Sequence, residues 1–270
     1  DLRDIASMSP NLIIDHISAS PQAAAISLRG INFQDLERSF EPTVGVVLDG
    51  IFLGTNSGAE LKIFDMERIE VLRGPQGTLF GRNTIGGVIN IIRTNPTGEF
   101  GLKTRGRYGN YDTQEFDGVF NFPLWEEKLA GKLTYANRKQ NDGYNENEFN
   151  GKDEAKVDYK SWSANLLAHP NDNLTLEYIY QRQDDNSQAG PVFNVSRPAD
   201  PSSGFAGDDL CVRFGQCQIN PRTPQTDDRH KSNTNFPLDS YYNVDSHTFE
   251  AAWNVTDTAR LTYIFGRIKS

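Results

Sequence analysis

Apolar and polar residues alternate with a period of two along most of the chain after residue 97. This period is typical of β-strands that present one apolar and one polar face. We count seven such segments, at about 102–108, 115–122, 129–136, 161–166, 174–181, 249–253 and 261–265. Charged residues such as Lys103, Arg105 and Asp117 occupy one face. Alternation alone fits a soluble sheet with a solvent-exposed face as well as a membrane barrel whose charged face lines a wet interior.

The connections between these segments favour the barrel. Short connections at 123–128, 170–173 and 256–258 fall at one end of the predicted strands. Longer connections, at about 141–156 and 183–240, fall at the other end together with the short turn 109–112. This layout is typical of outer-membrane barrels, and a connection as long as the second one is unusual in a compact soluble domain.

The first 96 residues have a different texture, with short segments separated by glycines. The pattern predicts strands at about 12–15, 25–30, 44–48, 51–53, 68–72 and 86–92, with a short helical turn at 63–66. The dipeptide Asp49-Gly50 is a strong turn signal between two of these strands. We therefore expect a β-rich chain, with a small mixed α/β domain at 1–96 followed by antiparallel barrel strands at 97–270.

Composition and charge exclude several classes of protein. The hydrophobic content is 37%, and the apolar runs are far shorter than the ~20 residues of a membrane helix, so a helical membrane protein is excluded. A formal charge of −9 argues against nucleic-acid binding. The four histidines are scattered, and no nucleophile–base pair or Cys/His cluster is recognisable. We expect no enzyme, no cofactor and no metal site.

A long motif occupies residues 70–92, with the sequence EVLRGPQGTLFGRNTIGGVINII. Shorter stretches accompany it: SLRG at 27–30, VLDG at 47–50 and FDMERIEV at 64–71. Together they closely resemble the plug domain of TonB-dependent outer-membrane receptors. The resemblance covers residues 9–96 and implies a plug lodged inside a multi-pass barrel of the bacterial outer membrane.

Physical chemistry agrees with this role for the motif. A plug must fold closely against other backbones, and five glycines permit positive φ and close approach: Gly74, Gly77, Gly81, Gly86 and Gly87. The resemblance also implies that plug arginines pair with barrel carboxylates. The candidates are Arg29, Arg73 and Arg82, although a purely solvating role for these arginines fits the sequence too.

The resemblance implies active transport of a scarce, bulky nutrient. A ferric siderophore is the commonest cargo of the family; an oligosaccharide, cobalamin or another metal complex is the alternative. The implied partners are a TonB-type inner-membrane complex, outer-membrane lipid, the extracellular ligand and a surface lipoprotein. Two outward plug segments, 32–41 and 54–58, supply candidate ligand contacts. They are Phe33, Gln34, Asp35, Arg38, Phe40, Thr55 and Asn56.

Two further expectations concern the loops and the barrel. Cys211 and Cys217 lie within the long extracellular loop, where a disulfide is favoured over a reactive pair or a metal site. A barrel that holds such a plug uses about 22 strands, so seven strands are a fragment, with open edges near 100–108 and 261–268. The competing functions are a passive gated porin, which needs no energy coupling, and a surface-binding or adhesion protein, which accumulates nothing inside the cell.

Overall fold

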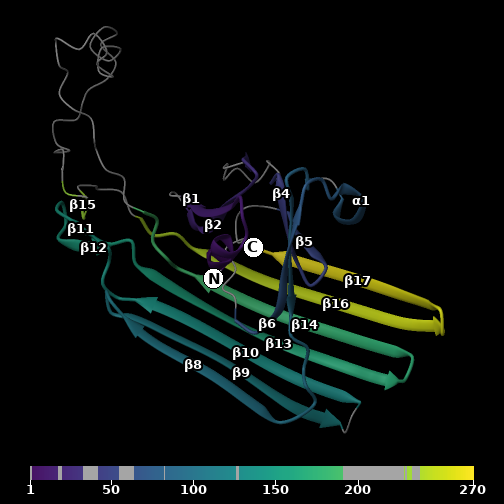
Figure 1. Cartoon of the computed structure of the whole chain (residues 1–270). Helices are drawn as coiled ribbons and strands as arrows, with labels where there is room; N and C mark the ends of the chain where they lie inside the picture. The colour runs from purple at the N-terminus through teal and green to yellow at the C-terminus, as the bar shows by residue number, and fades with distance from the viewer. Residues whose placement is uncertain are drawn as a thin grey trace.

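A computed structural model describes residues 2–17, 20–32, 42–54, 64–81, 83–125, 128–190, 228, 230–232 and 238–270. Two parts are visible in Figure 1: short strands from the first 93 residues, and a broad sheet of long strands from the remainder. We call residues 1–96 the plug region and the broad sheet the long sheet. In the described part of the chain, no helix is long and apolar enough to span a membrane.

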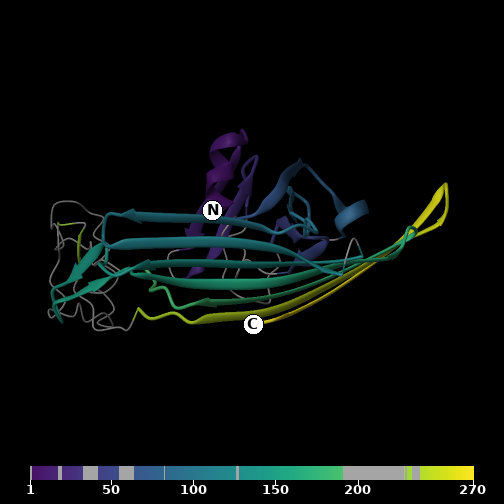
Figure 2. The same cartoon turned by 90° about the horizontal axis from the view of Figure 1, so that it is seen from below.

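The long sheet is an antiparallel meander of seven strands, as the alternation predicts. Its strands are β8 (Gly101–Gly109), β9 (Thr113–Trp125), β10 (Leu129–Gln140), β13 (Val157–Asn171), β14 (Leu174–Asp185), β16 (Tyr242–Thr256) and β17 (Ala259–Lys269). The strand order β17-β16-β14-β13-β10-β9-β8 leaves β8 and β17 at the two edges. The predicted open edges are therefore confirmed among the described residues, and the sheet curves without closing (Figure 2).

The two faces of the long sheet differ as a barrel wall requires. The outer face carries large apolar side chains that are exposed in this chain: Leu102, Phe120, Leu133, Trp162, Leu166, Tyr178, Trp253, Leu261, Tyr263 and Phe265. The inner face carries polar side chains, several of them buried: Asp117, Lys132, Ser161, Ser163, Asn165 and Gln183. The plug region lies against this inner face, and buried polar groups need hydrogen-bond partners. Several have them within the long sheet: Asp117 accepts from Arg105, Ser163 pairs with Thr134, and Asn165 donates to Glu177.

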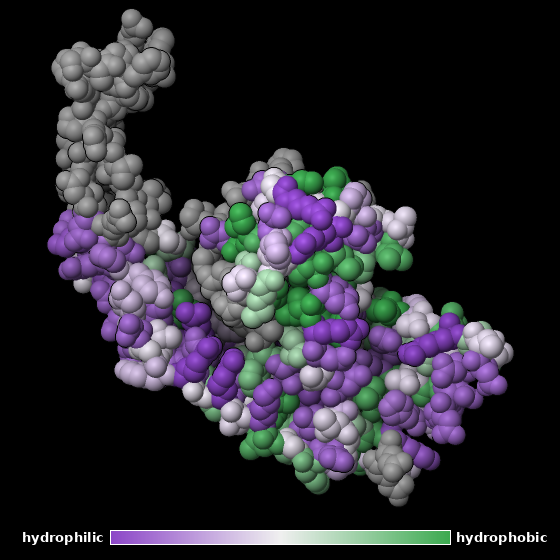
Figure 3. All heavy atoms as spheres, in the orientation of Figure 1, coloured by the Kyte–Doolittle hydropathy of each residue, from purple (hydrophilic) through white to green (hydrophobic). Residues whose placement is uncertain are grey.

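Long connections gather at one end of the sheet, which we call the long-loop end. The connection after β10 contains the hairpin β11 (Asn145–Asn147) and β12 (Lys152–Glu154), and the connection after β14 adds β15 (Lys231–Ser232) beside β11. The buried Glu154 carboxylate accepts hydrogen bonds from Asn147 Nδ2 and Ser232 Oγ. Hydrophilic residues surround these short strands (Figure 3).

The plug region, expected as a small mixed α/β domain, folds into two small sheets. The first contains β1 (Leu12–Ile17), β2 (Ser20–Leu28) and β3 (Ile31–Asn32), preceded by the 3-10 helix η1 (Leu2–Met8). The second has the order β5-β4-β7-β6, with β4 (Val44–Leu48), β5 (Ile51–Leu53), β6 (Met66–Arg73) and β7 (Gly87–Arg93). The helix α1 (Gly77–Phe80) lies between β6 and β7.

One apolar core joins the two sheets. Its buried residues are Leu12, Ile14, Ala24, Ile26, Leu28, Val44, Val46, Ile89 and Ile91. The predicted helical turn at 63–66 is wrong in its described part, since Met66 begins β6, where it pairs with Arg93 of β7. The predicted turn at Asp49-Gly50 is confirmed: both residues have positive φ, 46° and 78°, as a two-residue hairpin turn requires.

Candidate functional site

The residues expected to contact ligand lie outside the described residues. This holds for Phe33, Gln34, Asp35, Arg38, Phe40, Thr55 and Asn56, and also for Arg82, Cys211 and Cys217. Their roles stay predictions. The structure does describe the surface on which the plug region rests against the long sheet, and this surface is the candidate functional site.

The glycines of the motif divide into distinct structural roles. Gly74, Gly81 and Gly87 have positive φ values of 85°, 79° and 148°. Gly87 is also tightly enclosed: a Cβ there would lie 2.3 Å from the Leu72 carbonyl oxygen. Gly86 has ordinary φ, but a Cβ would lie 3.0 Å from Val44 Cγ2. Gly77 needs neither property, because it starts α1 in open space.

Among the described residues, no hydrogen bond or ion pair joins Arg29 or Arg73 to the long sheet. Arg73, at the end of β6, donates a hydrogen bond from Nη2 to Ser9 Oγ at 3.1 Å, within the plug region. Arg29 is exposed in the turn after β2, with a φ of 55°. Anchoring of the plug by these arginines is therefore still a prediction. Other residues join the two parts.

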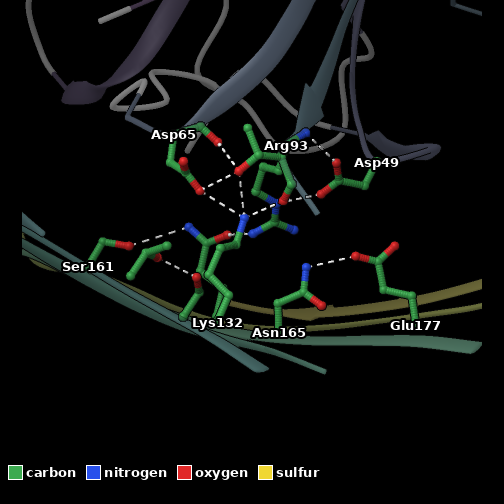
Figure 4. A network of polar contacts seen from close by, with 11 residues as sticks. Asp49, Asp65, Arg93, Lys132, Ser161, Asn165 and Glu177 are labelled. Atoms are coloured by element: carbon green, nitrogen blue, oxygen red, sulfur yellow. Dashed lines mark hydrogen bonds and ion pairs between the residues drawn. The ribbon is translucent and has the colours of Figure 1, made fainter. Parts of the chain in front are cut away.

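The first anchor is built around Lys132 on the inner face of β10. Its side chain is 3% exposed, and Nζ lies 2.8 Å from Asp65 Oδ2 and 2.9 Å from Thr94 Oγ1 (Figure 4). Nζ also donates to the Thr94 carbonyl oxygen, while Thr94 Oγ1 donates to Asp65 Oδ2 at 2.6 Å. A barrel lysine is thus held by two plug residues that precede β6 and follow β7. Every member of the cluster has a partner, as a buried charge requires.

The second anchor is built around Arg93 at the end of β7. Its Nε forms an ion pair with Asp49 Oδ2, and its backbone N–H donates to Asp49 Oδ1 at 2.9 Å. The remaining arm reaches the long sheet: Nη1 donates to Gln181 Oε1 of β14 at 2.9 Å. Gln181 in turn donates to Ser161 Oγ on β13 at 3.4 Å. The planar guanidinium serves two partners in fixed directions, which a lysine ammonium does less well.

Apolar and aromatic contacts complete the surface on which the plug region rests against the long sheet. Ile51 of β5 packs so closely on Gly266 of β17 that a Cβ at Gly266 would lie 2.5 Å from Ile51 Cδ1. On the opposite side, the Phe64 ring lies under two cations of β8, with Lys103 Nζ at 5.4 Å and Arg105 Cζ at 5.0 Å from its centroid. The plug region therefore contacts both edges of the long sheet as well as its centre.

Two cavities lie between the plug region and the long sheet. The larger, about 380 Å³, is bounded by β5 residues such as Phe52 and Leu53 and by inner-face residues such as Gln183, Ser246 and Thr248. Arg93 is the one charged side chain among the residues that line it in the described structure. A smaller pocket lies around Lys132 and Asn165. The long sheet thus retains space beside the seated plug region.

Within the plug region, the Glu70 carboxylate is stabilised by neighbouring side chains. Arg68 and Asn90 both donate hydrogen bonds to the Glu70 carboxylate, at 2.8 and 2.9 Å. These bonds, that of Arg68 foremost, hold the pKa of Glu70 below its usual range. In the described ranges, no three His, Cys, Asp or Glu side chains gather closely enough to hold a metal ion. The arrangement holds the plug region against the inner face of the long sheet.

Sequence reasoning missed the residues that make the anchors. Lys132 appears in the sequence as one polar position of an alternating segment, and Arg93 simply follows an apolar run. One usable signal was a lysine on the inward face of a predicted strand, since such a charge needs a partner once covered. The identity of that partner depends on how the plug region docks, which local pattern does not encode.

Comparisons with known proteins agree with this architecture. A family model described as "TonB-dependent Receptor Plug Domain" matches residues 1–88. The chain is 32% identical over 146 residues to the pesticin receptor of Yersinia pestis, covering 54% of this chain and 21% of that protein. The pesticin receptor of Yersinia enterocolitica gives the same values. The chain therefore spans about a fifth of the length of these relatives.

Solved structures show the same fold. The ferric yersiniabactin uptake receptor FyuA from Yersinia pestis has a TM-score of 0.75 at 21% identity, covering 98% of this chain and 37% of that chain. FpvA of P. aeruginosa, solved bound to heterologous pyoverdines, has a TM-score of 0.68 at 15% identity, covering 99% and 31%. At these identities the likeness concerns the fold: a plug region resting on the inner face of barrel strands.

Proposed function

We propose, from the premise that this chain comprises the plug domain and first barrel strands of a TonB-dependent outer-membrane receptor, that the whole protein actively imports a ferric siderophore. In this function the ligand binds on the long-loop side. A TonB-type inner-membrane complex then supplies the energy that displaces the plug.

One observation carries the energy-coupled part of the proposal. The plug region is held on the long sheet by one buried ion pair, Lys132 with Asp65, and by the hydrogen bond that Arg93 donates to Gln181. The ion pair of Arg93 with Asp49 lies within the plug region and orients the guanidinium. Separating one buried ion pair without a substitute partner costs about 3–5 kcal/mol. Spontaneous displacement of a plug held by this ion pair and by the Arg93–Gln181 hydrogen bond is therefore rare, and work from outside the barrel is needed to open a passage.

The substrate class rests on the relatives. One solved neighbour is named as a ferric yersiniabactin uptake receptor, and another was solved bound to pyoverdines. A ferric siderophore is therefore the first substrate to test, before an oligosaccharide, cobalamin or another metal complex. The proposed contacts are those that the plug resemblance supplies, with Phe33 and Arg38 as the most informative pair, one aromatic and one cationic.

The test is uptake of radioactive iron by cells that lack their own siderophore receptors and express the full-length protein. We expect ferric siderophore to bind at low temperature and to accumulate only in energised cells that contain TonB. A protonophore should abolish accumulation and leave binding intact. Accumulation that persists with the protonophore would favour a passive porin, and binding without any accumulation would favour an adhesion or capture protein.

The ligand contacts are tested separately by binding at low temperature. Phe33→Ala and Arg38→Ala should each weaken siderophore binding about tenfold or more, because each removes a contact from a site with few polar groups. Lys128→Ala, at the opposite end of the long sheet, is the control and should bind like the wild type. Unchanged binding by both test variants would remove these residues from the proposed site.

A further inference from the structure

Two glutamates face each other on the inner side of the long sheet. Glu177 of β14 and Glu250 of β16 are direct cross-strand partners, and both are half-buried. Both belong to the inner face, because Glu177 is four residues from Gln181 and Glu250 is two residues from Thr248, which border the larger cavity. Like charges directly opposite each other on neighbouring strands destabilise a sheet. We call Glu177 and Glu250 the carboxylate pair.

The strands that carry the carboxylate pair supply no cation to compensate it. The flanking residues of the same cross-strand row are apolar, Leu167 on β13 and Ile264 on β17. Neither β14 nor β16 has a lysine or an arginine at an inward position. Glu177 accepts one hydrogen bond, from Asn165 Nδ2 at 2.7 Å (Figure 4). Glu250 forms no ion pair with any residue that the structure describes.

Arg93 of the plug region brings a positive charge close to the carboxylate pair. The charge of Arg93 acts on the Glu177 carboxylate, as do those of Asp49 and Glu250. Arg93 Nε serves Asp49, while Nη1 donates to the neutral Gln181 amide of β14 at 2.9 Å. The arm of the guanidinium that faces the long sheet therefore has an uncharged partner, four residues along β14 from Glu177 (Figure 4).

The step from Gln181 to Glu177 has a definite direction in the barrel. Strand β14 begins at Leu174, after a short turn, and ends at Asp185, at the long-loop end. The step therefore leads toward the short turns, over about 13 Å of strand. Short turns of an outer-membrane barrel face the periplasm, the side from which an inner-membrane complex pulls.

Space for a movement in this direction exists beside Arg93. The cavity of about 380 Å³ is lined by Arg93, by Gln181 and by Thr248. Thr248 lies on β16 two residues before Glu250, so the cavity extends from the present partner of Arg93 toward the carboxylate pair. The guanidinium therefore has free volume on the side where the pair lies.

We propose, building on the energised import proposed above, that the carboxylate pair receives Arg93 when the plug is displaced. In the docked plug, Nη1 donates to the neutral Gln181 amide; in the displaced plug it donates to Glu177 and Glu250 instead. Opposite charges attract each other more strongly than a charge attracts a neutral amide, and the arriving cation also removes the repulsion within the pair. The two glutamates are thus positioning residues that stabilise the displaced plug and reduce the work of opening.

The experiment compares variants of the full-length receptor. The test variant, Glu177→Gln combined with Glu250→Gln, keeps the shape of both side chains and removes both charges. The matched control, Asp184→Asn combined with Asp245→Asn, removes two carboxylates from the same two strands at outward positions. Glu177→Asp combined with Glu250→Asp preserves the charge. Glu250→Gln alone is a second test variant, because it leaves the hydrogen bond of Asn165 to Glu177 intact.

The first assay is energised uptake of the radioactive ferric siderophore that the wild type accumulates, at saturating concentration. We expect the maximal rate of the test variant to fall about tenfold, between the effects of an exposed and of a fully buried ion pair. Binding at low temperature should be unchanged. Glu250→Gln alone should lose less, and the matched control and the charge-preserving variant should transport like the wild type.

The second assay needs no cargo and separates the proposed role from a merely structural one. It is hydrogen–deuterium exchange of the purified receptor, read on β7, whose amides exchange when the plug opens locally. Because the pair stabilises the displaced plug, the test variant should open less often and exchange about tenfold more slowly than the wild type. Carboxylates that merely held the docked plug would have the opposite effect, since their loss would speed exchange.

Uptake at the wild-type rate in the test variant would overturn the proposal, as would unchanged or faster exchange of β7. Equal losses in the matched control, or in the charge-preserving variant, would overturn it too. The failure of import itself gives a different result: the wild type then accumulates no ferric siderophore. Slower exchange of β7 in the test variant would still support the carboxylate pair as the receiving site for Arg93 in that case.

Discussion

Replacing Lys132 by methionine tests whether its buried ion pair with Asp65 holds the plug against the long sheet. Methionine keeps most of the length of the lysine side chain and removes its charge. Lys132 is 3% exposed and Asp65 is 11% exposed, so the substitution leaves a carboxylate with little access to water. Thr94 Oγ1 continues to donate to Asp65 Oδ2 at 2.6 Å, which satisfies part of the carboxylate.

The expected cost follows from this geometry. Breaking a buried ion pair by removing one partner costs about 3–5 kcal/mol. The bond that Thr94 retains places this case near the lower end, at about 3 kcal/mol. A change of that size raises the population of the locally opened plug by about 100-fold. The double variant Lys132→Met with Asp65→Asn should recover much of the loss, since the uncompensated carboxylate is gone.

Hydrogen–deuterium exchange of the full-length receptor is the assay, read on peptides that cover β6 and β7. These strands flank Asp65 and Thr94, so their amides report on release of the anchor. We expect about 100-fold faster exchange in Lys132→Met and a smaller effect in the double variant. The control is Lys160→Met, on the neighbouring strand but on the outer face.

Exchange of β6 and β7 at the wild-type rate in Lys132→Met would show that the ion pair does not hold the plug. Equal acceleration in Lys160→Met would show the same, because the effect would then reflect the loss of any lysine from the sheet. If the amides of the double variant are no better protected from exchange than those of Lys132→Met, leaving the Asp65 carboxylate without its cation costs no free energy. The Lys132–Asp65 ion pair would then not stabilise the docked plug.

Three further predictions concern Arg93, the glycine Gly87 of the plug region, and Glu154 at the long-loop end. Arg93→Lys should raise exchange of β7 about tenfold, because an ammonium cannot serve the Asp49 carboxylate and Gln181 in the same fixed directions. Gly87→Ala should destabilise the plug by more than about 3 kcal/mol in thermal unfolding, whereas Gly74→Ala, in open space, should cost only about 1 kcal/mol. Glu154→Ala should release β15 from β11, seen as faster proteolysis at 228–232, while barrel unfolding is unchanged.

The sequence by itself determined the long sheet. Period-two alternation assigns each residue to one face, and the apolar face then has to meet lipid while the polar face meets the lumen. The seven strands and the open edges at β8 and β17 follow from that pattern together with the lengths of the turns. The turn at Asp49-Gly50 was equally predictable, because few residues other than glycine and Asp or Asn accept two successive positive φ values.

Only the tertiary structure decided how the plug is anchored. Lys132, Asp65 and Thr94 are separated by 67 and 38 positions along the chain, and no local pattern links them. The division of the plug region into two sheets is likewise decided by packing, since Leu28 of one sheet and Ile89 of the other share one core. Local sequence sets strand propensity and facing, because these depend on neighbouring residues. The choice of partner for a buried charge depends on which surfaces meet, and that is settled only when the whole chain is folded.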